Sequence, residues 1–110
     1  MANSLRPIAI TILPASGLVP IYFTPHITTF TVSMIHISNV SSSGVNTRIC
    51  LVPSGSAAAI GNALIWDISV PANDFIEFGK GDIYAAGYSL HGKASADNSI
   101  NIKVAGIETT

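Results

Sequence analysis

Residues 28–39 read TTFTVSMIHISN and form the longest strand-like run in the chain. β-Branched and aromatic side chains favour strands because they pack well on a pleated surface. Simple alternation along this run places one set of side chains on a single face: Phe30, Val32, Met34 and His36. Ile35 and Ile37 then lie on the opposite face. Because the second half is apolar on both sides, we predict a strand in the middle of a sheet or covered by a neighbour.

Similar short runs precede and follow residues 28–39 in the sequence, separated by turn residues at intervals of about ten residues. We predict eight strands, at residues 8–13, 18–23, 28–39, 45–52, 63–70, 75–78, 88–96 and 99–108. Pro20 confines the second strand to a sheet edge or a bulge, because proline cannot donate a backbone hydrogen bond. Residues 53–62, built from Ser, Gly and Ala, predict a long loop.

Short strands at this spacing are typical of an antiparallel sandwich or barrel. We therefore predict an all-β protein: a single antiparallel β-sandwich of about eight strands, jelly-roll-like, with an open barrel as the alternative. The chain has 110 residues, enough for one domain. We assign residues 8–110 to this sandwich and residues 1–7 to an N-terminal arm.

Charged residues make up only 10% of the chain and hydrophobic residues 48%, whereas about 25% is charged in an average soluble domain. This composition excludes intrinsic disorder. The net charge of −1 gives no basic surface for nucleic acid. We expect no membrane span, because no apolar run approaches about 18 residues. The N-terminus does not read as a signal peptide, which predicts synthesis in a cytoplasm.

The scarcity of charge also predicts that neighbours cover much of the surface. A small monomer normally keeps its exposed area charged to stay soluble, whereas obligate interfaces resemble a domain core cut in half. We therefore expect a homo-oligomer or a place in a larger assembly.

The residue types that carry chemistry do not form a recognisable site. His26, His36 and His91 are single positions without the close pair that metal ligation usually needs, so we expect no metal and no cofactor. The carboxylates of turns and loops lack the opposed pair of a glycosidase: Asp74, Glu77, Asp82 and Asp97. Asp67 is expected on an outward surface.

Cys50 lies in mid-strand between Ile49 and Leu51, where a cysteine more often serves as a small buried hydrophobe than as a nucleophile. A lone cysteine also excludes a disulfide framework within the chain. We expect no catalytic residues, and therefore no enzyme.

The aromatic residues could build a platform for sugar stacking: Tyr22, Trp66, Tyr84 and Tyr88. Alternation along residues 63–70 turns Trp66 inward with Leu64, Ile68 and Val70, so we predict that it belongs to the core. Tyr84 and Tyr88 lie near a loop and remain candidate contact residues for a carbohydrate-binding adhesin.

Several segments together resemble small β-sandwich structural proteins of tailed bacteriophages and prophages: residues 22–25 (YFTP), 29–32 (TFTV), 35–39 (IHISN), 51–55 (LVPSG), 68–74 (ISVPAND) and 104–108 (VAGIE). The resemblance covers most of the chain, from about residue 18 to residue 108, and rests on strand rhythm and turn dipeptides.

The resemblance implies a virion protein that decorates or cements the capsid, with the major capsid protein as its partner. The alternative is an accessory part of a tail, baseplate or fibre. We expect the capsid surface as its location, after synthesis in the host cytoplasm, with the strand faces and residues 53–62 as contact surfaces. The resemblance supplies no catalytic residues.

Overall fold

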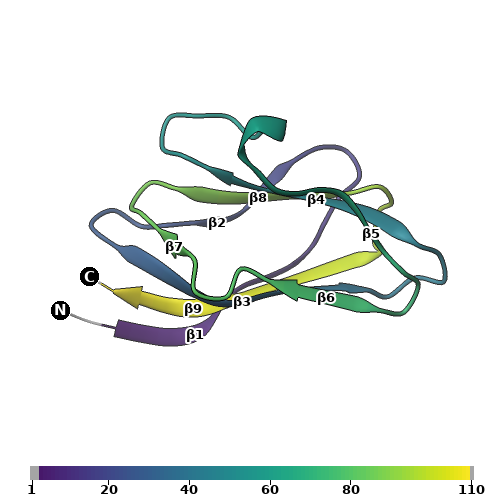
Figure 1. Ribbon diagram of the computed structural model, residues 1–110, viewed down its shortest axis with the longest axis horizontal. Helices are drawn as coiled ribbons and strands as arrows, with labels where there is room; N and C mark the ends of the chain where they lie inside the picture. Colours follow the sequence, from purple (N-terminus) through teal and green to yellow (C-terminus); the bar gives the residue numbers. More distant parts are fainter. Residues whose placement is uncertain (1–2, 110) are drawn as a thin grey trace.

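The computed structural model describes residues 3–109 and, among their side chains, those of residues 10–109. Two antiparallel sheets lie one above the other (Figure 1). The first sheet, sheet A, contains β1 (Asn3–Ile12), β3 (Thr29–Asn39), β6 (Phe75–Phe78), β7 (Ile83–Tyr84) and β9 (Ile100–Thr109). The second, sheet B, contains β2 (Val19–Phe23), β4 (Val45–Val52), β5 (Ala63–Val70) and β8 (Ser89–Ala94).

The strands pair as nested hairpins. β1 pairs with β9, β2 with β8, β3 with β6, and β4 with β5. Successive pairs alternate between the sheets, which gives the orders β1-β9-β3-β6 and β2-β8-β4-β5. A long hairpin rolled up in this way is a jelly roll. The predicted all-β sandwich is therefore confirmed.

Strand β3 is central, as predicted, but the side chains of its second half lie on the opposite side of the sheet from the one predicted. The register of β3 against β9 shifts between Val32 and Met34, which marks a bulge at Ser33. An extra residue reverses the alternation that follows. Ile35 and Ile37 therefore join Phe30 and Val32 in the core. The prediction that Met34 and His36 share a face with Phe30 and Val32 is wrong, since both lie on the outer side.

The core fills the space between the sheets with side chains from both. Sheet A contributes Phe30, Val32, Ile35, Ile37, Tyr84, Ile100, Ile102 and Val104. Sheet B contributes Tyr22, Val45, Ile49, Val70, Leu90 and Ala94. The predicted inward face of the last strand is confirmed, because Ile100, Ile102 and Val104 are at most 1% exposed.

The other elements agree with the sequence in part. β2 is an edge strand, and its register shifts between Pro20 and Tyr22, which confirms the predicted edge or bulge. The loop at residues 53–62 ends in a short 3-10 helix, η1 (Ile60–Asn62). The two-residue strand β7 was not predicted. The backbone of residues 3–7, assigned above to an arm, continues β1 and pairs with β9.

Candidate interaction surfaces

The three histidines lie apart, each with its own neighbours. His26 is exposed in the β2–β3 loop. His36 Nδ1 lies 2.8 Å from Glu77 Oε2, and its ring stacks on Phe75 with centroids 5.0 Å apart. His91 Nε2 lies 2.9 Å from the hydroxyl of Ser89, and partial burial lowers its pKa. Within residues 3–109, no three His, Cys, Asp or Glu side chains converge as metal ligands.

The carboxylates named from the sequence are likewise dispersed. Asp97 accepts a hydrogen bond of 2.7 Å from the backbone N–H of Ala15, and Asp74 accepts one of 2.7 Å from the N–H of Phe75. Glu77 contacts His36, and Asp82 is exposed beside β7. The contacts of Asp97 and Asp74 hold turn segments, and that of Glu77 joins β6 to β3.

Cys50 is fully buried, as predicted. It lies under the loop that follows β4, where its thiol is 3.4 Å from the carbonyl oxygen of Ala59. Burial raises the pKa of this thiol. A thiol that is buried and protonated is a poor nucleophile.

The aromatic residues do not build a platform. Tyr84 is fully buried, which overturns its assignment as a contact residue, and burial raises the pKa of its hydroxyl. Tyr22 is 8% exposed, and Tyr88 is half-buried against the core. Trp66, predicted to be inside, is paired with Arg48 on the outer side of sheet B instead. The register slips beside Asp67, whose φ of 56° marks a bulge that reverses the facing of β5.

That bulge builds the first candidate surface, a hollow of about 250 Å³ on the outer face of sheet B. Five of its six lining residues have polar side chains: Asn46, Arg48, Asp67, Lys93 and Ser95, with Ala94 as the sixth. Arg48 donates to Asp67 through Nε at 2.6 Å and Nη2 at 3.0 Å. Its guanidinium also lies 4.1 Å from the centre of the Trp66 ring.

These two contacts fix the Arg48 side chain in place. The hydrogen bonds with Arg48 lower the pKa of Asp67 and raise that of Arg48 itself. The lining carries two cations and one carboxylate. Sequence reasoning did not single out Arg48 or Lys93, because the bulge that brings Asp67 to Arg48 has no strong sequence signal.

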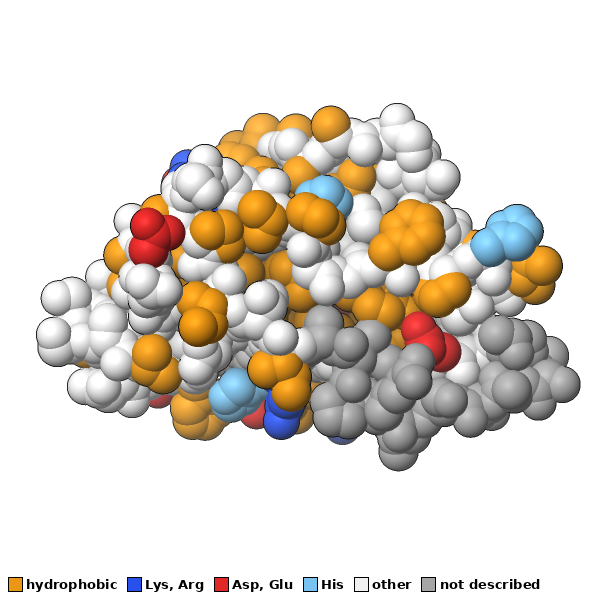
Figure 2. Space-filling view, turned by 180° about the vertical axis from the view of Figure 1, so that it is seen from behind, with side chains coloured by type: hydrophobic (Ala, Val, Ile, Leu, Met, Phe, Trp, Pro, Cys, Tyr) orange, Lys and Arg blue, Asp and Glu red, His pale blue; other side chains and the backbone are white. Residues whose placement is uncertain are grey.

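The outer face of sheet A is the second candidate surface. One row across its strands is Ile10, Lys103, His36 and Glu77, and the next is Ile12, Asn101, Ser38 and Phe75. Ile10 is 71% exposed, and Ile12 and Phe75 are more than half exposed. In Figure 2, hydrophobic, histidine, basic and acidic side chains lie side by side along the lower margin, where Figure 1 places sheet A.

The third candidate surface is the end of the sandwich at which β3 begins. The β2–β3 loop projects there, close to the C-terminus (Figure 1). Ile27 in this loop is 74% exposed and has a φ of 60°. Phe23, which precedes the loop, and Ile83, which pairs with Thr31 at the start of β3, are also exposed. We call Phe23, Ile27 and Ile83 the apolar tip.

No family model and no curated protein matches this chain. In the part of the chain that the structure describes, no helix has the length and apolar character needed to cross a membrane.

Proposed function

We propose that this protein is a non-enzymatic structural protein of a tailed-phage virion, a decoration or cement protein that binds the major capsid protein through the apolar tip. The observation that carries the proposal is Ile27, a β-branched residue held in a left-handed conformation while 74% exposed. The sequence resemblance supplies the class of assembly.

The conformation of Ile27 is costly. A left-handed backbone brings Cβ close to the following carbonyl oxygen, at about 1–2 kcal/mol for a non-glycine residue. Exposure of the side chain to water offsets none of that cost. Strained residues of this kind cluster at binding sites, where a partner makes use of the imposed geometry. Burial of Ile27 with Phe23 and Ile83 against a capsid protein would supply the missing stabilisation.

The charge of the chain supports the same function. Only 11 of 110 residues are Lys, Arg, Asp or Glu, as expected when neighbours cover much of the surface. A small sandwich docked between capsid subunits adds buried area without chemistry. Many weak contacts on one particle then act multivalently.

The first experiment locates the protein by gold-labelled antibody electron microscopy of particles from the producing lysate. Label distributed over the head supports decoration. Label confined to the tail or its tip favours the tail, baseplate or fibre alternative. Particles without label would overturn the virion assignment.

The second experiment tests the apolar tip with purified protein and particles. Asn tolerates the left-handed region better than Ile, so Ile27→Asn should raise the free energy of unfolding by about 1 kcal/mol while reducing particle binding at least tenfold. Val40→Asn is the matched control, because Val40 is 56% exposed on the β3–β4 connection, outside both the apolar tip and residues 53–62. Equal binding by both variants and the unmodified protein would remove the tip from the contact.

The hollow on sheet B favours a second candidate function, carbohydrate binding by an adhesin. Its amide, hydroxyl, carboxylate and guanidinium groups suit the hydroxyls of a sugar. A glycan array tests this: binding that is lost in Arg48→Ala and kept in Lys80→Ala would support an adhesin, and an array without signal would overturn it.

A further inference from the structure

We infer that two copies of this chain associate face to face through the outer surface of sheet A, around a two-fold axis that runs along β3. This inference rests on the proposed structural role and names the surface for self-association, which leaves the apolar tip for another partner.

The first observation is the order of charges across one row of the sheet. His36 on β3 lies between Lys103 on β9 and Glu77 on β6. Adjacent strands are about 4.8 Å apart, so the two charges sit at equal distances on either side of β3. The row therefore runs from positive to negative with His36 at its centre.

When two copies face each other, this order of charges brings opposite charges together only if the two-fold axis runs along β3. A two-fold rotation about β3 places Lys103 of one copy opposite Glu77 of the other, and forms that pair twice. A two-fold axis across the strands would oppose Lys103 to Lys103 and Glu77 to Glu77, and like charges in an interface are costly. No ion pair between described side chains uses Lys103 within its own chain.

Exposed apolar residues enter the interface in the same arrangement. The rotation lays β6 of one copy over β9 of the other, so the exposed ring of Phe75 faces Asn101, and Ile12 lies on the next strand, β1. Met34 and Ala105, paired on the neighbouring row, lie near the axis. This places exposed hydrophobic side chains where they lose contact with water.

The area suits a weak dimer. The strands that meet in this arrangement, β9, β3 and β6, have 10, 11 and 4 residues, and strands about 4.8 Å apart with a rise of about 3.3 Å per residue then give a flat surface of roughly 400 Å². Side chains that project from the sheet increase this area. A stable interface buries about 800 Å² on each partner. Sheets that pack face to face lie about 10 Å apart, a gap that Lys and Glu side chains bridge.

Charge reversal tests the arrangement in purified protein, by analytical ultracentrifugation over a concentration series. Lys103→Glu alone and Glu77→Lys alone should each weaken the dimer at least tenfold, because each creates two like-charge contacts. An equimolar mixture of the two variants should form a heterodimer, since both contacts are then attractive. The double variant should dimerise within about threefold of the unmodified protein.

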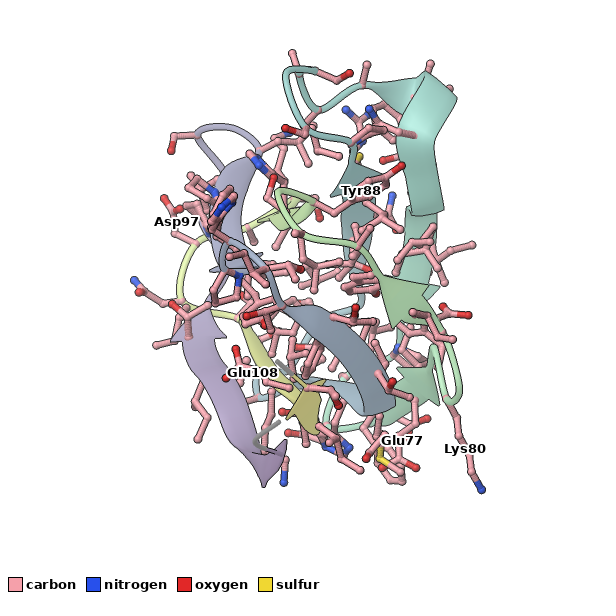
Figure 3. The ribbon with its side chains drawn as sticks, turned by 90° about the vertical axis from the view of Figure 1, so that its left-hand side faces the viewer. Glu77, Lys80, Tyr88, Asp97 and Glu108 are labelled. Carbon is pink, nitrogen blue, oxygen red and sulfur yellow. The ribbon has the colours of Figure 1, made fainter. Side chains whose placement is uncertain are left out.

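Lys80→Glu is the matched control. It makes the same change of charge, and Lys80 extends away from the sandwich, whereas Glu77 lies against it (Figure 3). Its dimer should be unchanged. The inference is overturned if the unmodified protein is monomeric at about 100 μM, if Lys80→Glu weakens the dimer as much as Lys103→Glu, or if the mixed variants stay monomeric. None of these results bears on whether the protein is found on virions.

Discussion

The hydroxyl of Tyr22 on β2 donates a hydrogen bond of 2.7 Å to Oε2 of Glu108 on β9. Because β2 belongs to sheet B and β9 to sheet A, this bond crosses the interior and joins the two layers. Tyr22 also packs on Phe30, with ring centroids 4.6 Å apart. A polar and an aromatic contact thus hold one end of the sandwich together.

Tyr22→Phe should lower the free energy of unfolding by about 1.5–3 kcal/mol. The change keeps the ring on Phe30 and removes a hydrogen bond to a charged group, a contact of about that value. Urea denaturation followed by tryptophan fluorescence measures the change. A variant as stable as the unmodified protein would show that the bond contributes nothing net.

Tyr84→Phe should have the opposite outcome. Its hydroxyl is fully buried and has no hydrogen-bond partner among the described residues. Removing an unsatisfied buried hydroxyl is neutral or stabilising, by up to about 1–2 kcal/mol. The same urea titration checks this, and a clear loss of stability would mean that the hydroxyl has a partner.

The Arg48–Asp67 pair should contribute stability that depends on pH. The hydrogen bonds with Arg48 hold the pKa of Asp67 below its ordinary value of 3.8. A lowered folded-state pKa gives stability that is present above the unfolded-state pKa, near 3.9, and lost as pH falls through the folded-state pKa. Asp67→Asn keeps a residue that tolerates positive φ and removes the charge.

Denaturation midpoints of the unmodified protein and Asp67→Asn should therefore differ at pH 7, begin to approach each other below about pH 4, and converge once the pH is below the folded-state pKa of Asp67. Added salt should also reduce the difference, because both side chains are partly exposed. A difference that persists unchanged at pH 2.5 would rule out the ion pair as its source.

Gly106→Ala should destabilise the sandwich by about 3 kcal/mol or prevent folding. A Cβ at Gly106 would lie 2.6 Å from the Phe30 ring and would overlap the carbonyl oxygen of Thr31. Backbone atoms cannot move aside cheaply, so overpacking follows. Gly61→Ala is the control, since a Cβ there meets nothing within 4 Å, and circular dichroism melts compare the two. Equal melting temperatures would contradict the close approach.

The sequence predicts where most strands lie but not which face each residue takes. Composition and turn residues locate the eight main strands, and Pro20 correctly indicates an edge. The side of the sheet on which a side chain lies can be predicted only while the alternation is unbroken. One inserted residue moves every later side chain to the opposite side. The bulge at Ser33 turns Ile35 and Ile37 inward. The second half of residues 28–39 is apolar on both faces, which agrees with such a break, but alternation alone places Ile35 and Ile37 on the wrong side.

The candidate surfaces were harder to predict for the same reason. The positive φ of Asp67 moves Trp66 outward and brings Arg48 to Asp67, and non-glycine residues rarely signal that conformation. Tyr84 lies in a two-residue strand that forms only because β3 offers a free edge. Strand pairing of this kind depends on tertiary structure, so no local sequence pattern predicts it. The row of Lys103, His36 and Glu77 likewise needs the strand order.

The pairing of β1 with β9 also affects how the protein is made. Strand β9 lies between β1 and β3 in sheet A, and of the described strands it leaves the ribosome last. Until it emerges, β1 lacks its neighbour and sheet A is divided. Contacts between residues as distant as Asn3 and Thr109 make folding slow. The sandwich therefore closes only once β9 is available, and a nascent chain of β1–β8 presents open strand edges until then.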